Sequence, residues 1–183
     1  MRRSYCIWCV PLLLFAALAL TWTPTQAATS QIQTFLPLIM NPPAVSQQIQ
    51  QLLDVTNQLR LANGCSALVL SPKLTAAAQG HSDDMAHHNY FSHIGFDGST
   101  LALRINAAGY TGWLLAAENI AAGFPTAQAV VSAWFNEPPD ATGHRGHREN
   151  ILNCNLKEMG GGYTNLIGTT YTSYWTQDFG TRS

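Results

Sequence analysis

A chain of 183 residues with a formal net charge of −1 is long enough for one ordinary domain and a short additional segment. Only 10% of its residues are charged, and its nine lysines and arginines form no cluster of five or more, which excludes a nucleic-acid-binding protein held by a basic surface. The apolar fraction of 46% suits a folded core and excludes a charge-rich disordered chain.

The first 27 residues have the pattern of a secretory signal peptide. Arg2 and Arg3 form a basic start, an apolar run extends from Val10 to Leu20, and the small residue Ala27 offers a cleavage site. This run is short for a membrane span, and no later stretch is long enough for one. The alternative is an uncleaved N-terminal anchor.

Residues 28–44 carry three prolines and no charge, and we expect a linker or a strap that lies on the domain at 45–183. Cleavage after residue 27 leaves seven basic and ten acidic side chains, a net charge of −3. Two cysteines then remain, Cys65 and Cys154. An even number of cysteines in an exported chain predicts a disulfide, with two buried free thiols as the alternative.

Helices dominate the first part of the domain, where apolar residues recur at helical spacing. We predict helices at 45–61, 71–88, 99–108 and 125–136. In the second of these, Ser71 stands at the N-cap and Pro72 in the first turn.

Strands are expected mainly towards the end of the chain. The candidates are an extended segment at 112–123 and two strands at 158–164 and 169–179. Helices interleaved with a few late strands predict an α/β fold, a layered sandwich with an antiparallel sheet.

The chemistry of the sequence is concentrated in six histidines, all between positions 81 and 147, and in a few carboxylates. Glu118 lies in an apolar stretch, so its carboxylate either lines a cleft or has a buried partner. A lone histidine is more often structural than a ligand, and we expect His81 to pack against the sheet and His87 to face solvent. No dense metal-binding motif occurs in the sequence.

Four sequence blocks occur in one order and together carry a family resemblance. The blocks are HNYFSH (88–93) followed by DGST (97–100), AENIA (117–121), GHRENIL (146–152), and EMGGGY (158–163) with YWTQDFG (174–180). The set resembles the CAP superfamily of cysteine-rich secretory proteins, venom antigens and plant pathogenesis-related class 1 proteins, and most of all its bacterial SCP-like extracellular branch. The resemblance covers residues 48–181 and implies an α-β-α sandwich with a central antiparallel sheet and an open cleft.

The cleft of that family carries two histidines and two acidic residues. The resemblance assigns the histidines to His93 and His147 and one acid to Glu118, with Asn119 beside it. Two neutral imidazoles can bind a divalent cation, so a metal site at His93 and His147 is implied. Zinc is the first choice, with magnesium or calcium as alternatives.

Two positions of the cleft depart from the family pattern. The nearest candidate for the second acid is Asp97, whose alternative is a turn or capping residue. His144 competes with His147, but Asn150-Ile151-Leu152 follow His147 in register, so we expect His144 at the rim of the cleft.

Two classes of function stay open. The first is a secreted binding module for a peptide, a lipid or a cell-envelope component, favoured because no nucleophile in the sequence has an evident activating base. The second is a weak metal-assisted hydrolase or protease, in which Glu118 and Asp97 would be catalytic. We expect a monomer with no nucleic-acid partner and no membrane span in the mature chain.

Overall fold

A four-stranded sheet is the centre of residues 46–183, the part of the chain that the computed structural model describes. The strands follow the order β1-β3-β4-β2, with bounds Val69–Leu70 for β1, Trp113–Ala122 for β2, Glu158–Asn165 for β3 and Ser173–Arg182 for β4. β2, β3 and β4 are antiparallel, as predicted, whereas the two-residue strand β1 runs parallel to β3 and makes the sheet mixed. The predicted signal peptide (1–27) and the linker or strap (28–44) lie outside the described residues.

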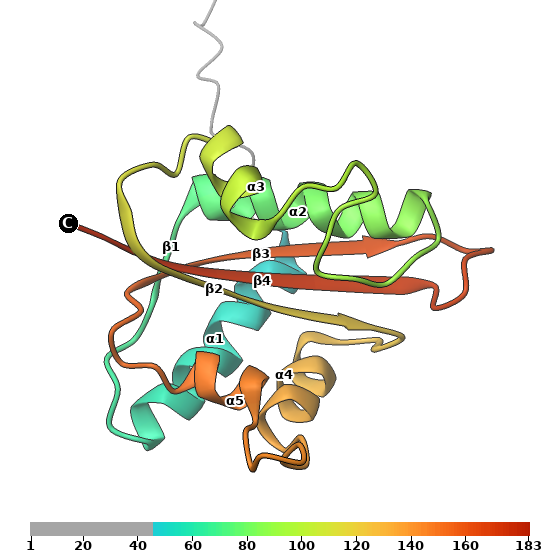
Figure 1. Cartoon of the computed structure of the whole chain (residues 1–183). Coiled ribbons are helices and arrows are strands. Elements are labelled where there is room, and N and C mark those ends of the chain that lie inside the picture. Colours follow the sequence, from blue (N-terminus) through green and yellow to red (C-terminus); the bar gives the residue numbers. More distant parts are fainter. Residues whose placement is uncertain (1–45) are drawn as a thin grey trace, which may run out of the picture. The chain divides into compact units, whose positions relative to one another are not determined.

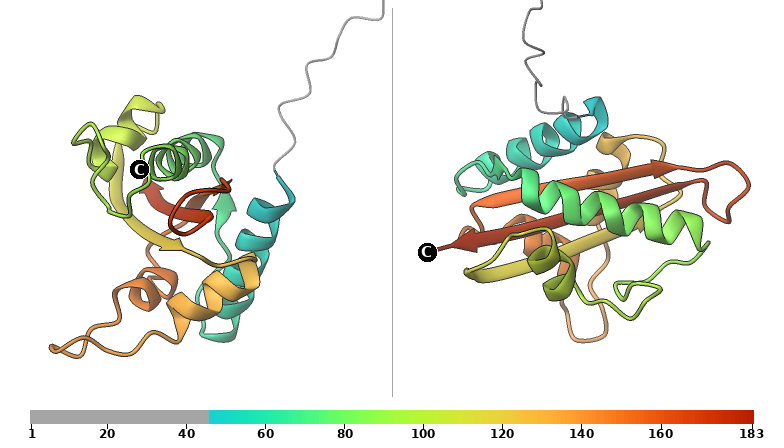
Figure 2. Two further views of the ribbon diagram at one scale, coloured as in Figure 1. Left: turned by 90° about the vertical axis from the view of Figure 1, so that its right-hand side faces the viewer. Right: turned by 90° about the horizontal axis from the view of Figure 1, so that it is seen from above.

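Helices cover both faces of the sheet, which confirms the α/β sandwich (Figures 1 and 2). One layer consists of α2 (Pro72–His87) and α3 (Leu101–Ala107), and the other of α1 (Gln47–Ala62), α4 (Ala127–Phe135) and α5 (Gly146–Ile151). β2 is an edge strand, so the connections after α2 and after α4 reach its free side from the two layers (Figure 2, left).

The four predicted helices are confirmed as α1 to α4, each within two residues at either end. Pro72 stands in the first turn of α2, but the side chain of Ser71 makes no capping hydrogen bond, whereas Thr100 and Thr126 cap α3 and α4. The last strand begins later than predicted because the residues before Ser173 form a turn, in which Thr172 has a φ of 63°. The short helix α5 was not predicted.

α2 rests directly on the sheet because β3 has glycines beneath it. A Cβ atom on Gly160 would lie 2.1 Å from the backbone of Leu74, and one on Gly162 would lie 2.2 Å from the carbonyl oxygen of Ala78. Only residues without a side chain permit this approach. It brings α2 into contact with β3 and β4.

A disulfide and a buried arginine join the end of α1 to the segment after α5. Cys65 and Cys154 are bonded, as predicted, with 4.9 Å between their Cα atoms. Arg60 is fully buried and donates hydrogen bonds to the carbonyl oxygens of Ile151, Asn153 and Leu156. Both contacts fix the chain that leads into β3.

We predict that a Cys65→Ala/Cys154→Ala variant loses about 4–5 kcal/mol of unfolding free energy, because the bond closes a loop of 89 residues in the unfolded chain. Urea unfolding of the oxidised wild type, the reduced wild type and the variant measures the loss. Equal midpoints for all three proteins would contradict a stabilising bond.

Candidate functional site

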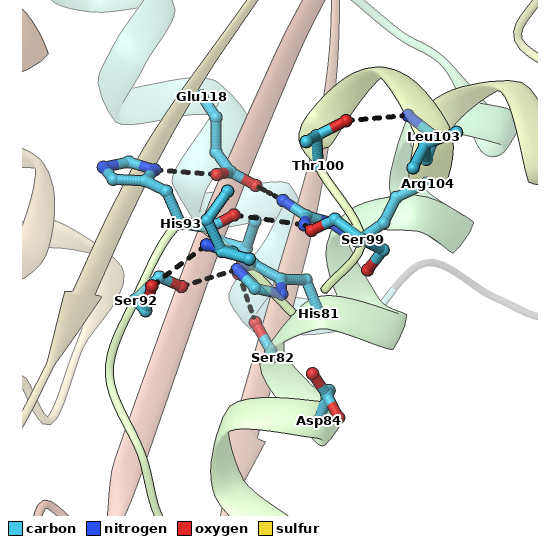
Figure 3. A network of polar contacts seen from close by, with 12 residues as sticks. His81, Ser82, Asp84, Ser92, His93, Ser99, Thr100, Leu103, Arg104 and Glu118 are labelled. Atoms are coloured by element: carbon cyan, nitrogen blue, oxygen red, sulfur yellow. Dashed lines mark hydrogen bonds and ion pairs between the residues drawn. The ribbon is translucent and has the colours of Figure 1, made fainter. Parts of the chain in front are cut away.

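Glu118 is the centre of the first polar cluster and lies in the middle of the edge strand β2. Its side chain is only 4% exposed. Oε1 lies 2.7 Å from Nδ1 of His93, and Oε2 accepts a hydrogen bond of 2.5 Å from the guanidinium of Arg104 (Figure 3). His93 comes from the connection between α2 and α3, and Arg104 from α3, so one carboxylate joins three segments of the chain.

Arg104 also fixes the backbone that carries His93. Its guanidinium donates to the carbonyl oxygen of His93 at 3.1 Å and to that of Ser99 at 2.9 Å (Figure 3). Its side chain is 10% exposed, so these are shielded, charge-assisted hydrogen bonds. The position of the first histidine is therefore set from both its ring and its main chain.

The hydrogen bond with Glu118 sets the tautomer of His93. Burial alone would raise the pKa of Glu118, but the hydrogen bond with His93 and the positive charge of Arg104 lower it below its usual range. The carboxylate accepts from Nδ1–H of His93, so the tautomer that this bond selects has its lone pair on Nε2. The His93 side chain is 55% exposed, so that lone pair is open to solvent.

Glu137 and His147 form a second pair of the same kind. Nδ1 of His147 lies 2.5 Å from Oε2 of Glu137, while Oε1 accepts from the backbone N–H groups of His147 and Arg148 at 2.7 and 3.2 Å. These N–H groups are in the first turn of α5, where they have no partner within the helix. Glu137 therefore accepts hydrogen bonds from the first turn of α5 and also orients the ring of His147.

The buried Asn119 and the partly buried Asn150 connect the second pair to the first. Asn119 donates to the carbonyl oxygen of His147 at 3.2 Å, and Asn150 on α5 donates to Oδ1 of Asn119 and to the carbonyl oxygen of Glu118. Glu118 and Asn119 are consecutive on β2, so their side chains lie on opposite faces of the sheet. Adjacent positions of one edge strand therefore hold the segments that carry the two histidines.

The acid that pairs with the second histidine is Glu137, whereas the predicted Asp97 makes a local contact. Oδ1 of Asp97 accepts from the backbone N–H of Ser99 at 2.8 Å, which is the turn role given as its alternative. Within residues 46–183, no hydrogen bond joins Asp97 to His93 or His147. Glu137 is absent from the sequence-based predictions, although a lone carboxylate three residues after the buried Trp134 was a usable signal.

The other histidines take peripheral or structural places. His144 is exposed and lies 3.2 Å from Oε1 of Glu149, outside both pairs. His81 is fully buried, its Nε2 donates to the carbonyl oxygen of Ser92 at 2.9 Å, and burial lowers its pKa, which keeps it neutral. His87 is exposed, as expected.

An apolar cavity of about 300 Å³ adjoins the second pair. Glu137 and His147 form part of its wall, and the rest is mainly apolar, with Phe91, Ile120, Phe124, Trp134 and Tyr171. The carbonyl oxygen of Ile120 on β2 accepts from Nε1 of Trp134 at 3.0 Å, as that of Glu118 accepts from Asn150. These backbone carbonyl oxygens at the sheet edge already accept hydrogen bonds from the protein, so a ligand would contact side chains there.

The domain is thus an α/β/α sandwich in which two histidines, each held by a carboxylate, come from segments that are hydrogen-bonded to the edge strand β2. Residues 53–179 match the family model of the cysteine-rich secretory protein family, CAP. The chain belongs to this family, as its sequence blocks predicted.

Two uncharacterized proteins of Bacillus subtilis are among its relatives. The membrane protein YlbC is 32% identical over 71% of this chain and 33% of its own length, and YkwD is 33% identical over 75% of this chain and 49% of its own length. The chain thus spans between a third and a half of these relatives.

Solved structures agree with this assignment. An extracellular SCP-domain protein of Bacillus anthracis is 32% identical with a TM-score of 0.61, over 74% of this chain and 40% of that one. An outer surface protein of Borrelia burgdorferi is 24% identical with a TM-score of 0.60, over 73% of this chain and 92% of that one, and supports the fold alone.

We predict that Glu118→Gln destabilises the protein by about 3–5 kcal/mol at neutral pH, because it leaves the shielded charge of Arg104 without its partner. The pKa of Glu118 is lower in the folded than in the unfolded protein. Its stabilising contribution is therefore present above the unfolded value of about 4.3 and is lost as the pH falls through the folded value.

Urea unfolding across acid and neutral pH measures both effects. Glu149→Gln is the matched control, since Glu149 pairs with His144 on the surface and contributes little. A Glu118→Gln variant as stable as Glu149→Gln would contradict the structural role of the ion pair.

Proposed function

We propose that this chain is an extracellular binding module that holds a divalent cation through Nε2 of His93 and Nε2 of His147. The observation that carries the proposal is that each imidazole is bound at Nδ1 by its own carboxylate, Glu118 or Glu137. A carboxylate at Nδ1 is the usual support of a metal-binding histidine, because it fixes the tautomer and the ring orientation.

The donor set fits a weakly held ion. Two neutral imidazoles suit zinc, and water or a ligand group would complete its coordination. Residues 46–183 contain no group of three or more His, Cys, Asp or Glu side chains arranged to hold a metal, so the protein supplies only two donors. Such a site exchanges its ion and leaves positions for a bound molecule.

The cavity beside His147 supports a ligand with an apolar part, in a peptide, a lipid or a cell-envelope component. Its walls include Phe91, Trp134 and Tyr171, and Phe91 and Tyr171 are partly exposed. An apolar group there would lie next to the cation-binding face of His147. An aromatic wall with one polar side is typical of small-ligand sites.

An extracellular location is supported by two observations. The first 27 residues have the pattern of a signal peptide, and the Bacillus anthracis protein is described as extracellular. No helix within residues 46–183 is long and apolar enough to cross a membrane.

A metal-assisted hydrolase is the second candidate, because a carboxylate–imidazole pair is also the arrangement of a general base. In that case the bound cation would supply an activated water. Glu118 would act by orienting His93, since its two oxygens are occupied by His93 and Arg104.

We predict that zinc binds the wild-type protein in a calorimetric titration and that a His93→Ala/His147→Ala variant gives no binding heat. His144→Ala and His87→Ala are matched controls, and we expect both to retain the wild-type affinity. Equal heats for the wild type and the double variant would refute the site. Turnover of a peptide library that disappears with the same double variant would favour the hydrolase.

We also predict that Glu137→Gln weakens zinc binding by about 10- to 100-fold, because the neutral amide no longer fixes and polarises His147. Competition of each variant with a chromogenic chelator measures the change. Glu149→Gln, which alters an exposed carboxylate of α5, is expected to leave the affinity unchanged. An unchanged affinity in Glu137→Gln would remove Glu137 from the site.

A further inference from the structure

Asp178 is a fully buried carboxyl group in an unusual position on β4. Its side chain has no exposed surface, and neither of its oxygens has a hydrogen-bond partner within residues 46–183. A buried carboxyl without a partner is costly, so its surroundings must explain how it is tolerated.

The sheet register places Asp178 beside Glu118. Asp178 is opposite Glu118 on β2 and opposite Gly160 on β3. Residues directly opposite in an antiparallel sheet project their side chains on the same face, so the two carboxyl groups are neighbours under the layer of α2 and α3. On the other side Gly160 has no side chain, and the backbone of Leu74 closes the space above it.

The charges around the pair allow only one ionised carboxylate. The titratable groups of the surrounding elements are Glu118 on β2, Arg104 on α3, His81 and Asp84 on α2, and His93 in the connection between α2 and α3. Arg104 is the permanent cation among them, since His81 is kept neutral by burial. One cation cannot balance two buried negative charges, and Arg104 bonds Glu118 directly.

We propose that Asp178 is a positioning residue, a neutral carboxylic acid at neutral pH that donates its hydrogen to Glu118. A carboxylate can accept about four hydrogen bonds, so Glu118 has room for this donor beside His93 and Arg104. The third contact comes from the adjacent strand and holds the Glu118 side chain against its other partners. The carboxylate that orients the first histidine is thereby fixed on three sides.

The electrostatics agree with this geometry. Burial, followed by the negative charge of Glu118, raises the pKa of Asp178 well above its usual range, and Arg104 only partly opposes the rise. A proton on Asp178 also turns one of its unpaired carboxyl oxygens into a hydrogen-bond donor, with the Glu118 carboxylate beside it as the acceptor. Its loss at alkaline pH would place two negative charges side by side and displace Glu118.

The role of Asp178 in cation binding rests on the proposed function, whereas the inference that its carboxyl group is protonated does not. Carbon-13 NMR of protein labelled at its six aspartates tests the proton directly. We expect one aspartate carboxyl to keep the chemical shift of the protonated acid at neutral pH, and that signal to be missing in Asp178→Asn. Six ionised aspartates in the folded wild type at neutral pH would overturn the proposal without any variant.

Thermal unfolding gives an independent reading. Between the unfolded pKa of about 3.9 and the raised folded value, the folded wild type holds one proton more than the unfolded chain, so its stability falls as the pH rises. Asp178→Asn lacks this dependence, and its melting temperature relative to the wild type should increase from about pH 5 to about pH 8. Asp54→Asn, an exposed change on α1, is the control and should follow the wild type. A constant difference between Asp178→Asn and the wild type would contradict the proton.

Nitrogen-15 NMR of the His93 ring separates positioning from a merely structural role. The amide of Asp178→Asn can still donate to Glu118, so His93 should keep its proton on Nδ1 as in the wild type. Asp178→Ala has no donor, and we expect a mixture of the two ring tautomers. A wild-type His93 signal in folded Asp178→Ala would overturn the positioning role. None of these measurements uses zinc, so a failed zinc titration leaves them unaffected.

Discussion

The polar site of this protein depends on one shielded ion pair, between Glu118 on the edge strand and Arg104 on α3. An isolated carboxylate at 4% exposure would be prohibitively costly, so Glu118 requires Arg104 nearby. Nη1 of Arg104 in turn donates to the carbonyl oxygens of Ser99 and His93. The ion pair is thus tied to the backbone of the connection that presents His93.

The same solution is built a second time from unrelated segments. Glu137 satisfies the first turn of α5 and orients His147, just as Glu118 satisfies Arg104 and orients His93. In each pair, the other hydrogen bonds of the carboxylate fix its position, and the imidazole receives a defined tautomer as a consequence. Each of these two carboxylates therefore contributes both to stability and to the orientation of a histidine. Replacing either carboxylate affects both properties.

The layers of the fold could be predicted from the sequence, because helical spacing and the ordered sequence blocks are local signals. The pairing of His93 with Glu118 could be predicted as a shared cleft. The position of Glu137 could have drawn attention to it, but its partners could not be predicted, because they belong to a six-residue helix that the sequence pattern did not reveal. Asp97 illustrates the opposite error: an acid close in sequence to His93 is bound to a local turn instead. Both contacts are close in the chain, 10 residues apart for Glu137 and His147 and two for Asp97 and Ser99, and the sequence pattern alone did not distinguish them.

The surroundings of Asp178 are also something that sequence patterns cannot supply. In the sequence it is a polar residue within a strand of otherwise buried side chains, and only the register with Glu118 shows that it adds a second carboxyl to a space with one cation. The imbalance is resolved most simply by a proton, since the layer of α2 lies too close above Gly160 to admit a further charged side chain. The glycines that let α2 rest on the sheet thus close the space beside Asp178, and the bond from Arg104 leaves the negative charge on Glu118.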